Sequence, residues 1–276
     1  MKRSFSRFVG VDLGGGRGKT TAVAELRSGP DGGAQVVEVA TRSGQRAWTD
    51  DTLFERLGGR PDIAIAIDAP LTAPACGRCD RPVCPGMETC VDPSVVWLRT
   101  TGRALVQKVA AETVGGSRTY TSMPQVRIAG YAHRATDLVM TYQRGLLPLT
   151  TLNSAHGAVA ARANQLRRRL RGAGFELHTN LIEVSPAATI AAVCGETLAR
   201  GYKRDADPWR TRAMILERLG DLSFAPQSRM AREEVLQNDH CFDAVISGYT
   251  AYLWARDGWT VPDGVFADDG WVFAPP

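Results

Sequence analysis

The sequence contains no apolar run that approaches the roughly 20 residues of a membrane-spanning helix. Its first residues, MKRSFSRF, are basic and lead directly into a strand-like segment, without the apolar stretch of a signal peptide. These absences predict a protein that does not enter a membrane and has a cytoplasmic location. The charge is also nearly balanced, at +4. A mildly basic chain of this kind is compatible with a polyanionic partner but does not identify one.

A phosphate-binding P-loop is also missing, although residues 8–20 read FVGVDLGGGRGKT. The pattern Gly-x-x-x-x-Gly-Lys-Ser/Thr would require glycine at position 13, where the chain has Leu13. A dinucleotide fingerprint fails because no helical pattern follows the glycines. The next residues, KTTAVAEL, are strand-like, so the stretch predicts two strands joined by a tight turn, with Asp12 near the end of the first. Neither a Ser-His-Asp pattern nor a Gly-x-Ser-x-Gly motif occurs elsewhere.

The composition that remains is that of a globular protein with a sizeable core. The chain has 276 residues, of which 44% are hydrophobic and 22% are charged. It shows no internal repeat and no linker long enough to require a second domain. We therefore expect one domain over residues 1–276, interrupted at about 71–95 by a loop rich in cysteine and proline.

The order of strand-like and helical segments predicts a mixed α/β sheet. Strand-like segments occur at 7–12, 19–26, 34–40, 61–70 and 175–183. Helical patterns occur at 50–59, 95–112, 135–146, 154–172 and 239–258. Three strands in consecutive hairpins, followed by strands separated by helices, give three antiparallel strands extended by parallel ones.

Carboxylates recur where the predicted strands end. Asp12, Asp68 and Glu183 close three strands, and Asp239 and Asp243 stand four residues apart at the beginning of the last helix. Because strand ends of an open α/β sheet meet at one edge, we expect these acids to converge there. Converging carboxylates repel one another unless a cation neutralises them, and Mg²⁺ or Mn²⁺ prefers such ligands. Two such ions support phosphodiester hydrolysis. Asp239 alone also fits a helix cap.

Several motifs together resemble a known family. GVDLG at the first hairpin, IDAPL, EVSP after a strand and the late DHCFDAV followed by YTA are similar to the family catalogued as domain of unknown function 429. Its members are described as predicted nucleases with a ribonuclease H-like fold. The resemblance covers about 10–259 and implies acidic site positions at Asp12, Asp68, Glu183 and Asp243, with Asp239 beside them. The family often has His-Pro-Glu where this chain has Ser-Pro-Ala at 185–187, which removes a possible acid/base group.

Four cysteines lie within fifteen residues in the spacing C-x2-C-x4-C-x5-C: Cys76, Cys79, Cys84 and Cys90. In a chain of cytoplasmic type, thiols this close favour a metal site over disulfides. Zn²⁺ bound by four thiolates and a [4Fe–4S] cluster both fit this set of ligands. Reduced, unpaired cysteines in a surface loop are the remaining interpretation. Cys194 and Cys241 lie in apolar helical segments and are expected in the core.

Basic residues suggest where a phosphate backbone would bind. Arg127 and Arg134 precede or open a helix between the predicted parallel strands, and we expect them to contact substrate phosphates. The run Arg167 to Arg169, with Arg162 and Arg171 beside it, gives the 154–172 helix a basic face. Such a face fits nucleic acid as a partner, and it also fits ordinary solvated surface.

Three functions follow from these observations. The first is a nuclease that uses Mg²⁺ or Mn²⁺ held by the acidic residues. The second is an ATP-dependent phosphotransferase of the actin and sugar-kinase type, because the first hairpin of those proteins also reads Gly-x-Asp-x-Gly-Gly. That class usually repeats the whole domain, and this chain shows no second hairpin of the kind. The third is a non-catalytic nucleic-acid-binding protein held together by the cysteine loop.

Overall fold

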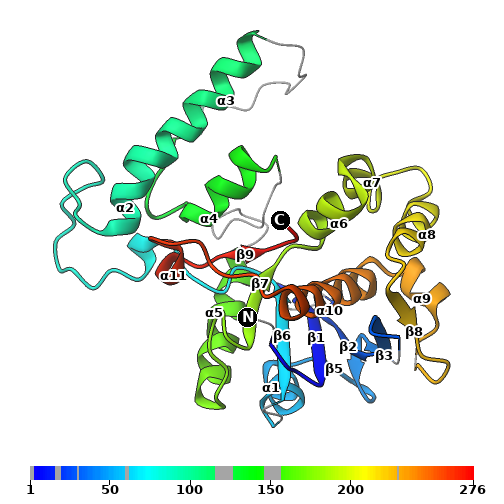
Figure 1. The fold of residues 1–276 in the computed structure, drawn as a ribbon. Helices are drawn as coiled ribbons and strands as arrows, with labels where there is room; N and C mark the ends of the chain where they lie inside the picture. Colours follow the sequence, from blue (N-terminus) through cyan, green and yellow to red (C-terminus); the bar gives the residue numbers. More distant parts are fainter. Residues whose placement is uncertain are drawn as a thin grey trace.

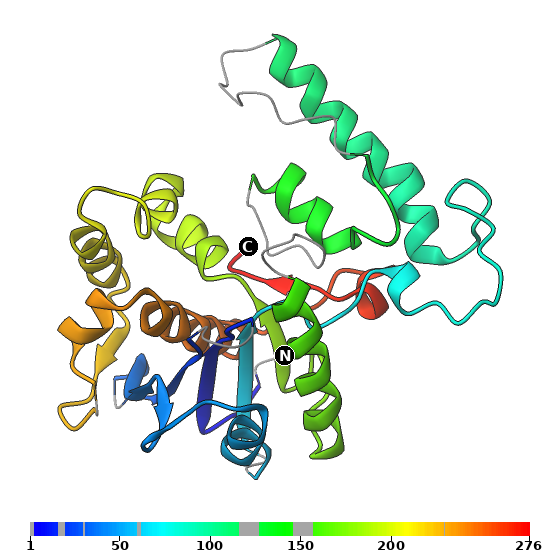
Figure 2. The ribbon, with the colours of Figure 1, turned by 180° about the vertical axis from the view of Figure 1, so that it is seen from behind.

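The fold is built on one seven-stranded sheet with helices on both faces, seen in the computed structural model (Figures 1 and 2). The strand order is β8-β3-β2-β1-β6-β7-β9. Strands β1, β2 and β3 pair antiparallel, and β6, β7, β9 and β8 join by parallel pairing. The structure describes residues 3–15, 20–29, 31–59, 62–115, 127–145, 157–228 and 230–276, without the side chains of 110–115.

The boundaries of the elements are as follows. The strands are β1 Arg7–Asp12, β2 Ala22–Ser28, β3 Ala34–Ala40, β6 Ile63–Asp68, β7 Leu181–Val184, β8 Leu222–Phe224 and β9 Val272–Phe273, with a separate hairpin of β4 Arg42–Ser43 and β5 Arg46–Ala47. The helices are α1 Asp50–Gly58, α2 Pro93–Trp97, α3 Arg103–Gly115, α4 Ala135–Leu138, α5 Gly157–Gly172, α6 Pro186–Cys194, α7 Glu196–Gly201, α8 Pro208–Arg218, α9 Arg232–Gln237, α10 Asp239–Asp257 and α11 Phe266–Asp269. A 3₁₀ turn covers Ala75–Gly77, and π-helical turns cover Leu98–Gly102 and Val139–Gln143.

Alternation along the central strands separates two hydrophobic cores. Val9 and Val11 of β1 and Ile65 and Ile67 of β6 join the core beneath α1 and α5. The residues between them, including Phe8, face the other core, which is covered by α10 and by helices of the 186–237 segment. Asp12 and Asp68 share the alternation of this second set, so their side chains leave the sheet on the α10 face.

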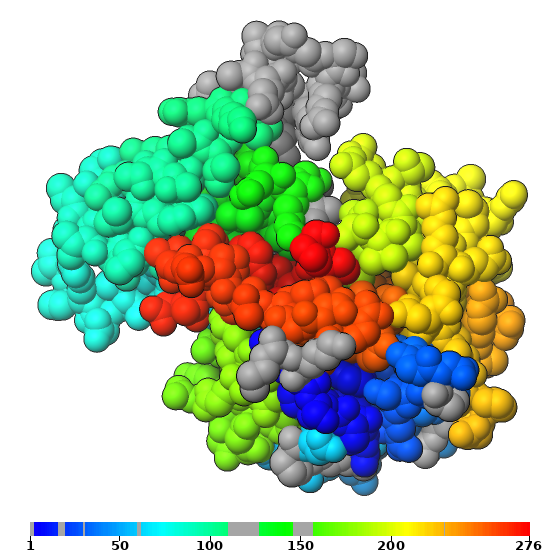
Figure 3. Space-filling view, in the orientation of Figure 1, coloured from blue at the N-terminus to red at the C-terminus, as the bar shows by residue number. Residues whose placement is uncertain are grey.

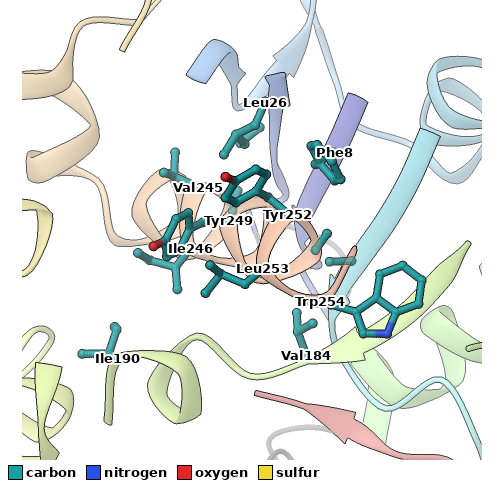
Figure 4. Close-up of a cluster of buried hydrophobic side chains, with 14 of the residues drawn as sticks. Phe8, Leu26, Val184, Ile190, Val245, Ile246, Tyr249, Tyr252, Leu253 and Trp254 are labelled. Atoms are coloured by element: carbon teal, nitrogen blue, oxygen red, sulfur yellow. The ribbon is translucent and has the colours of Figure 1, made fainter. Parts of the chain in front are cut away.

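Helix α10 is the centre of this second core. Every residue from Cys241 to Ala255 is buried, although the helix also carries an aspartate in that stretch. Figure 4 shows its aromatic and aliphatic side chains packed between residues of the sheet and Ile190 of α6. A helix that is apolar on all sides lies inside a protein, and α10 is enclosed by the sheet and the surrounding helices.

Two glycines let α10 lie directly against β1. A Cβ added at Gly10 would lie 2.0 Å from the carbonyl oxygen of Ala244 and 2.2 Å from the backbone nitrogen of Gly248. A Cβ added at Gly248 would lie 2.5 Å from Leu26. The two backbones therefore touch where larger residues would keep them apart.

The strand pattern predicted from the sequence is confirmed for the centre of the sheet and incomplete at its ends. The predicted strand at 175–183 is wrong for residues 175–180, since only Leu181–Val184 is a strand. Glu176 donates its backbone N–H to Oδ1 of Asn180 at 2.7 Å, and His178 has a φ of 67°, so residues before β7 form a turn. The short edge strands β8 and β9 were not predicted. Part of the glycine-rich turn, residues 16–19, lies outside the described residues.

Residues between β6 and β7 include a lobe that projects from the sheet, formed by the cysteine loop, α2, α3 and α4 (Figures 1 and 3). Its small core contains Leu98, Ile128 and Leu138, with Met87 and Trp97 packed against it. Among the helices that the structure describes, none is long and apolar enough to cross a membrane.

Replacing Gly10 by alanine is expected to lower the free energy of unfolding by about 1–3 kcal/mol, because the methyl group would clash with the backbone of α10. Gly59→Ala is the matched control, since a Cβ there meets nothing within 4 Å. Its effect should stay within about 0.5 kcal/mol. Urea unfolding at neutral pH measures both. Equal midpoints for the two variants would contradict the backbone contact.

Candidate active site

Two of the predicted acids lie side by side on neighbouring parallel strands. Asp12 of β1 and Asp68 of β6 are register partners at the carboxyl ends of these strands. Their side chains point to the same face, because the residues two positions earlier, Gly10 and Ala66, are also partners on that face. The parallel pairing therefore brings together two carboxylates that are far apart in the sequence.

The third acid, Asp243, belongs to helix α10, which lies on this face. Asp243 stands in the first part of α10 and is only 1% exposed. The close packing of α10 on β1 carries it toward the strand ends. Both of its carboxylate oxygens are buried and lack a hydrogen bond of good geometry among the described residues. A buried carboxylate in this state carries a large desolvation cost.

The electrostatics show that the three carboxylates act on one another. Burial, followed by the charges of Asp243 and Asp12, raises the pKa of Asp68 well above its usual range. Burial likewise raises the pKa of Asp243 from 3.8 to about 6, with Lys203 opposing the shift and Asp12 adding to it. This arrangement favours a bound proton or a bound cation over bare charge. The structure therefore brings Asp12, Asp68 and Asp243 together, and their role in catalysis stays a prediction.

Lys203, which was not singled out from the sequence, supplies a positive charge to this cluster. Its Nζ makes an ion pair with Oδ2 of Asp243, while its side chain remains 41% exposed. Tyr202 lies beside it with a ring that packs against Phe242. Burial, and then the charges of Asp243 and Asp68, raise the pKa of Tyr202. Both residues follow α7 in an irregular turn, where no sequence motif marks them.

His240 forms another polar contact at the strand ends. Its Nδ1 lies 2.6 Å from Oδ2 of Asp12, and this hydrogen bond raises the pKa of the imidazole. The sequence signal was its place between Asp239 and Asp243. The helix cap is Asn238, whose side chain accepts from the N–H of Cys241, so Asp239 does not serve as the cap. Asp239 lies in the first turn, where its charge acts on His240 and Cys241.

Glu183 and Arg134 require a correction to the predicted site. Glu183 pairs with Ile67, so alternation directs it to the face opposite that of Asp68. There its Oε1 and Oε2 accept hydrogen bonds from the guanidinium of Arg134 at 2.7 and 2.8 Å. Arg134 is fully buried and also pairs with Asp137 at 2.7 Å. Because the guanidinium of Arg134 is buried and its donors are paired with Glu183 and Asp137, it does not face a substrate phosphate. Glu183 is its ion-pair partner.

The other basic residues divide between exposed and internally paired positions. Arg127 is exposed and remains a prediction for phosphate contact. In α5, Arg162 binds Asp50 at 2.6 Å and donates to the carbonyl of Gly14. Arg167 donates to a backbone carbonyl, and Arg169 pairs with an acid of α1. Much of the predicted basic face therefore fastens α5 to its neighbours.

The cysteine loop lies between β6 and α2. Cys76, Cys79 and Cys84 are exposed, Cys90 is half-buried, and none forms a disulfide. Cys194 and Cys241 are buried, as predicted. Within the described ranges, no group of three or more His, Cys, Asp or Glu side chains is already arranged to hold a metal ion.

Replacing Asp243 by asparagine is expected to stabilise the metal-free protein at pH 8 by about 1–3 kcal/mol. The raised pKa of about 6 means that the folded protein holds this proton more tightly than the unfolded chain, so ionisation costs stability as the pH rises through the interval from 3.8 to 6. The gain should vanish below about pH 3, where both states are protonated. Urea unfolding in EDTA at the two pH values tests this. A loss of stability at pH 8 would mean that the ion pair with Lys203 outweighs the burial.

Replacing Arg134 by methionine should destabilise the protein by about 3–5 kcal/mol, because Glu183 and Asp137 would lose a buried partner. Arg127→Met, at an exposed arginine, serves as the control and should change stability by less than about 0.5 kcal/mol. Thermal and urea unfolding compare the two. Similar small effects for both would restore Arg134 as a candidate for substrate contact.

Comparison with known proteins identifies a family but no characterised relative. No curated protein matches the chain, and no solved structure does. A family model described as "Protein of unknown function (DUF429)" matches residues 10–265, a range that includes Asp12, Asp68, Lys203 and Asp243. The match confirms the resemblance seen in the sequence, and the chain belongs to the DUF429 family.

Proposed function

We propose that the protein is a nuclease that hydrolyses the phosphodiester bonds of nucleic acid. Asp12, Asp68 and Asp243 would hold the divalent ions that this reaction requires. The observation that carries this proposal is the convergence of the three carboxylates on one face of the sheet, where the buried Asp243 faces Asp12 and Asp68 with Lys203 as the positive charge beside it. Carboxylates this close together destabilise the fold when they are ionised, and a bound cation would offset their repulsion.

The chemistry of these residues fits Mg²⁺ or Mn²⁺. Both ions take carboxylate oxygens as ligands and keep open positions for water and phosphate. Lys203 contributes one positive charge against three carboxylates, which leaves a net negative site. An ion bound by Asp12, Asp68 and Asp243 would supply an activated water and stabilise the leaving oxygen.

The protein's own residues indicate how a polyanion would approach. Lys203 and His240 are the half-exposed members of the cluster, each with 41% of its side chain accessible. Both lie next to a carboxylate that we assign to the ion, Lys203 at Asp243 and His240 at Asp12. Their positive charge would attract a phosphate to the open side of the site and orient it there.

The order of the sheet supports the same proposal. The central order β3-β2-β1-β6-β7, with three antiparallel strands followed by parallel ones, is the layout expected for a ribonuclease H-like fold. Because one fold can host unrelated functions, the carboxylate geometry carries more weight than the topology. Membership in the DUF429 family agrees with the proposal without naming an activity.

The test is Mn²⁺-dependent cleavage of labelled single-stranded and double-stranded DNA and RNA. Asp68→Asn should lower the rate at least about 100-fold, because it removes a carboxylate that holds the ion. Asp62→Asn is the matched control, an exposed acid just before the same strand. It should retain full activity. In addition, Mn²⁺ should raise the unfolding temperature of the original protein and the control but not of Asp68→Asn.

Other outcomes would overturn the proposal. ATP hydrolysis or phosphoryl transfer without polynucleotide cleavage would favour the phosphotransferase of the actin and sugar-kinase type. Nucleic-acid binding with no cleavage in Mg²⁺ or Mn²⁺ would favour a binding protein. Equal cleavage by Asp68→Asn and the original protein would point to a contaminating nuclease.

A further inference from the structure

The loop that carries the four clustered cysteines has almost nothing apolar to hold it in place. Residues 76–86 are all exposed, and no helix or strand lies between Gly77 and Pro93. Val83 and Val91 are 77% and 68% exposed. Met87 alone packs against the small core of the lobe. A loop of this length needs another source of stability.

The two ends of the loop are nevertheless fixed to the lobe through backbone contacts. The N–H of Cys76 donates to the carbonyl of Gly130 at 3.1 Å, and a Cβ added at Gly130 would lie 2.9 Å from Sγ of Cys76. At the other end, the guanidinium of Arg99 donates to the carbonyl of Cys90 at 3.0 Å. It also donates to the carbonyls of Met87 and Glu88. These contacts leave the thiols themselves available.

A tight turn separates Cys84 from Cys90. The N–H of Gly86 donates to Sγ of Cys84 at 3.4 Å, and the N–H of Cys90 donates to the carbonyl of Gly86 at 3.0 Å. Gly86 has a φ of 84°, which makes this turn possible. The chain therefore folds back between Cys84 and Cys90, and Cys76 and Cys79 precede this turn by a few residues.

We infer that Cys76, Cys79, Cys84 and Cys90 bind one Zn²⁺ ion, which closes the loop and is separate from the acidic site. Four thiolates in a tetrahedron about 2.3 Å from the ion are a standard structural zinc site. In the described structure the four sulfurs do not form this tetrahedron. Cys79 and Cys84 lie on the exposed part of the loop, so closure on the ion requires only a local change in its backbone. Metal binding of this kind is coupled to local folding.

The chemistry favours zinc over an iron–sulfur cluster. Zn²⁺ has no redox chemistry, so a site with three exposed cysteines does not expose a reactive cluster to solvent. The loop also has a structural role to perform. Its Arg78 binds Oδ1 of Asp269 at 2.6 Å, and the other oxygen of Asp269 accepts from the N–H of Ala135 at the beginning of α4. Closing the loop would hold Arg78 in this contact.

The test is the metal content of the purified full chain by mass spectrometry, with zinc in the growth medium and no chelator during purification. We expect about one zinc per chain in the original protein. The double variant Cys79→Ser/Cys84→Ser should contain at least about 10-fold less zinc. Cys194→Ala, which changes a buried cysteine elsewhere, should retain it. Circular dichroism verifies that each variant is folded.

Replacement by Co²⁺ gives a second measurement, because thiolate ligands produce an intense charge-transfer absorption that the double variant should lack. Asp68→Asn should keep its zinc, so failure of the nuclease proposal and failure of the zinc proposal are distinguishable. Absence of zinc from the original protein, equal zinc in the double variant, or a brown protein that contains iron would each overturn the inference.

Discussion

The backbone contact between α10 and β1 determines where the polar groups of this protein meet. Gly10 and Gly248 let a helix and a strand approach until their main chains touch, and no larger residue fits at Gly10. This approach buries the whole middle of α10 and brings Asp243 down to the ends of β1 and β6. If the helix lay farther from the sheet, water would reach Asp243 and the carboxylates would no longer act on one another.

Two acidic clusters on opposite faces of the sheet show how partners decide the role of a carboxylate. Glu183 and Asp137 share the guanidinium of Arg134, which satisfies them with paired hydrogen bonds. Asp68 and Asp243 are not paired with a guanidinium in this way, and their pKa values are raised. The first cluster fastens the lobe to the sheet. The second keeps buried charge at a cost to stability, which is typical of groups retained for binding or catalysis.

Polar contacts also hold the lobe, because its own hydrophobic core is small. Thr72 donates to the carbonyl of Asp269 at 2.6 Å and accepts from Arg134 at 2.8 Å. Asp269 is fully buried between Arg78 and α4. The chain after β6, the beginning of α4 and the segment before β9 therefore meet in one network. Buried networks in which every member has a partner specify a single arrangement of the elements that they join.

The sequence by itself determined the central strands, the carboxylates at their ends and the long last helix, because alternation, apolar runs and glycine turns are local signals. It also indicated the family. It did not determine which face Glu183 takes, because that depends on the register of β7 against β6, in which Glu183 pairs with Ile67. Nor did it identify Lys203 or His240 as partners of Asp243 and Asp12, or show Arg134 to be buried. Those contacts join residues far apart in the chain, and only the packing of helices and lobe against the sheet decides them.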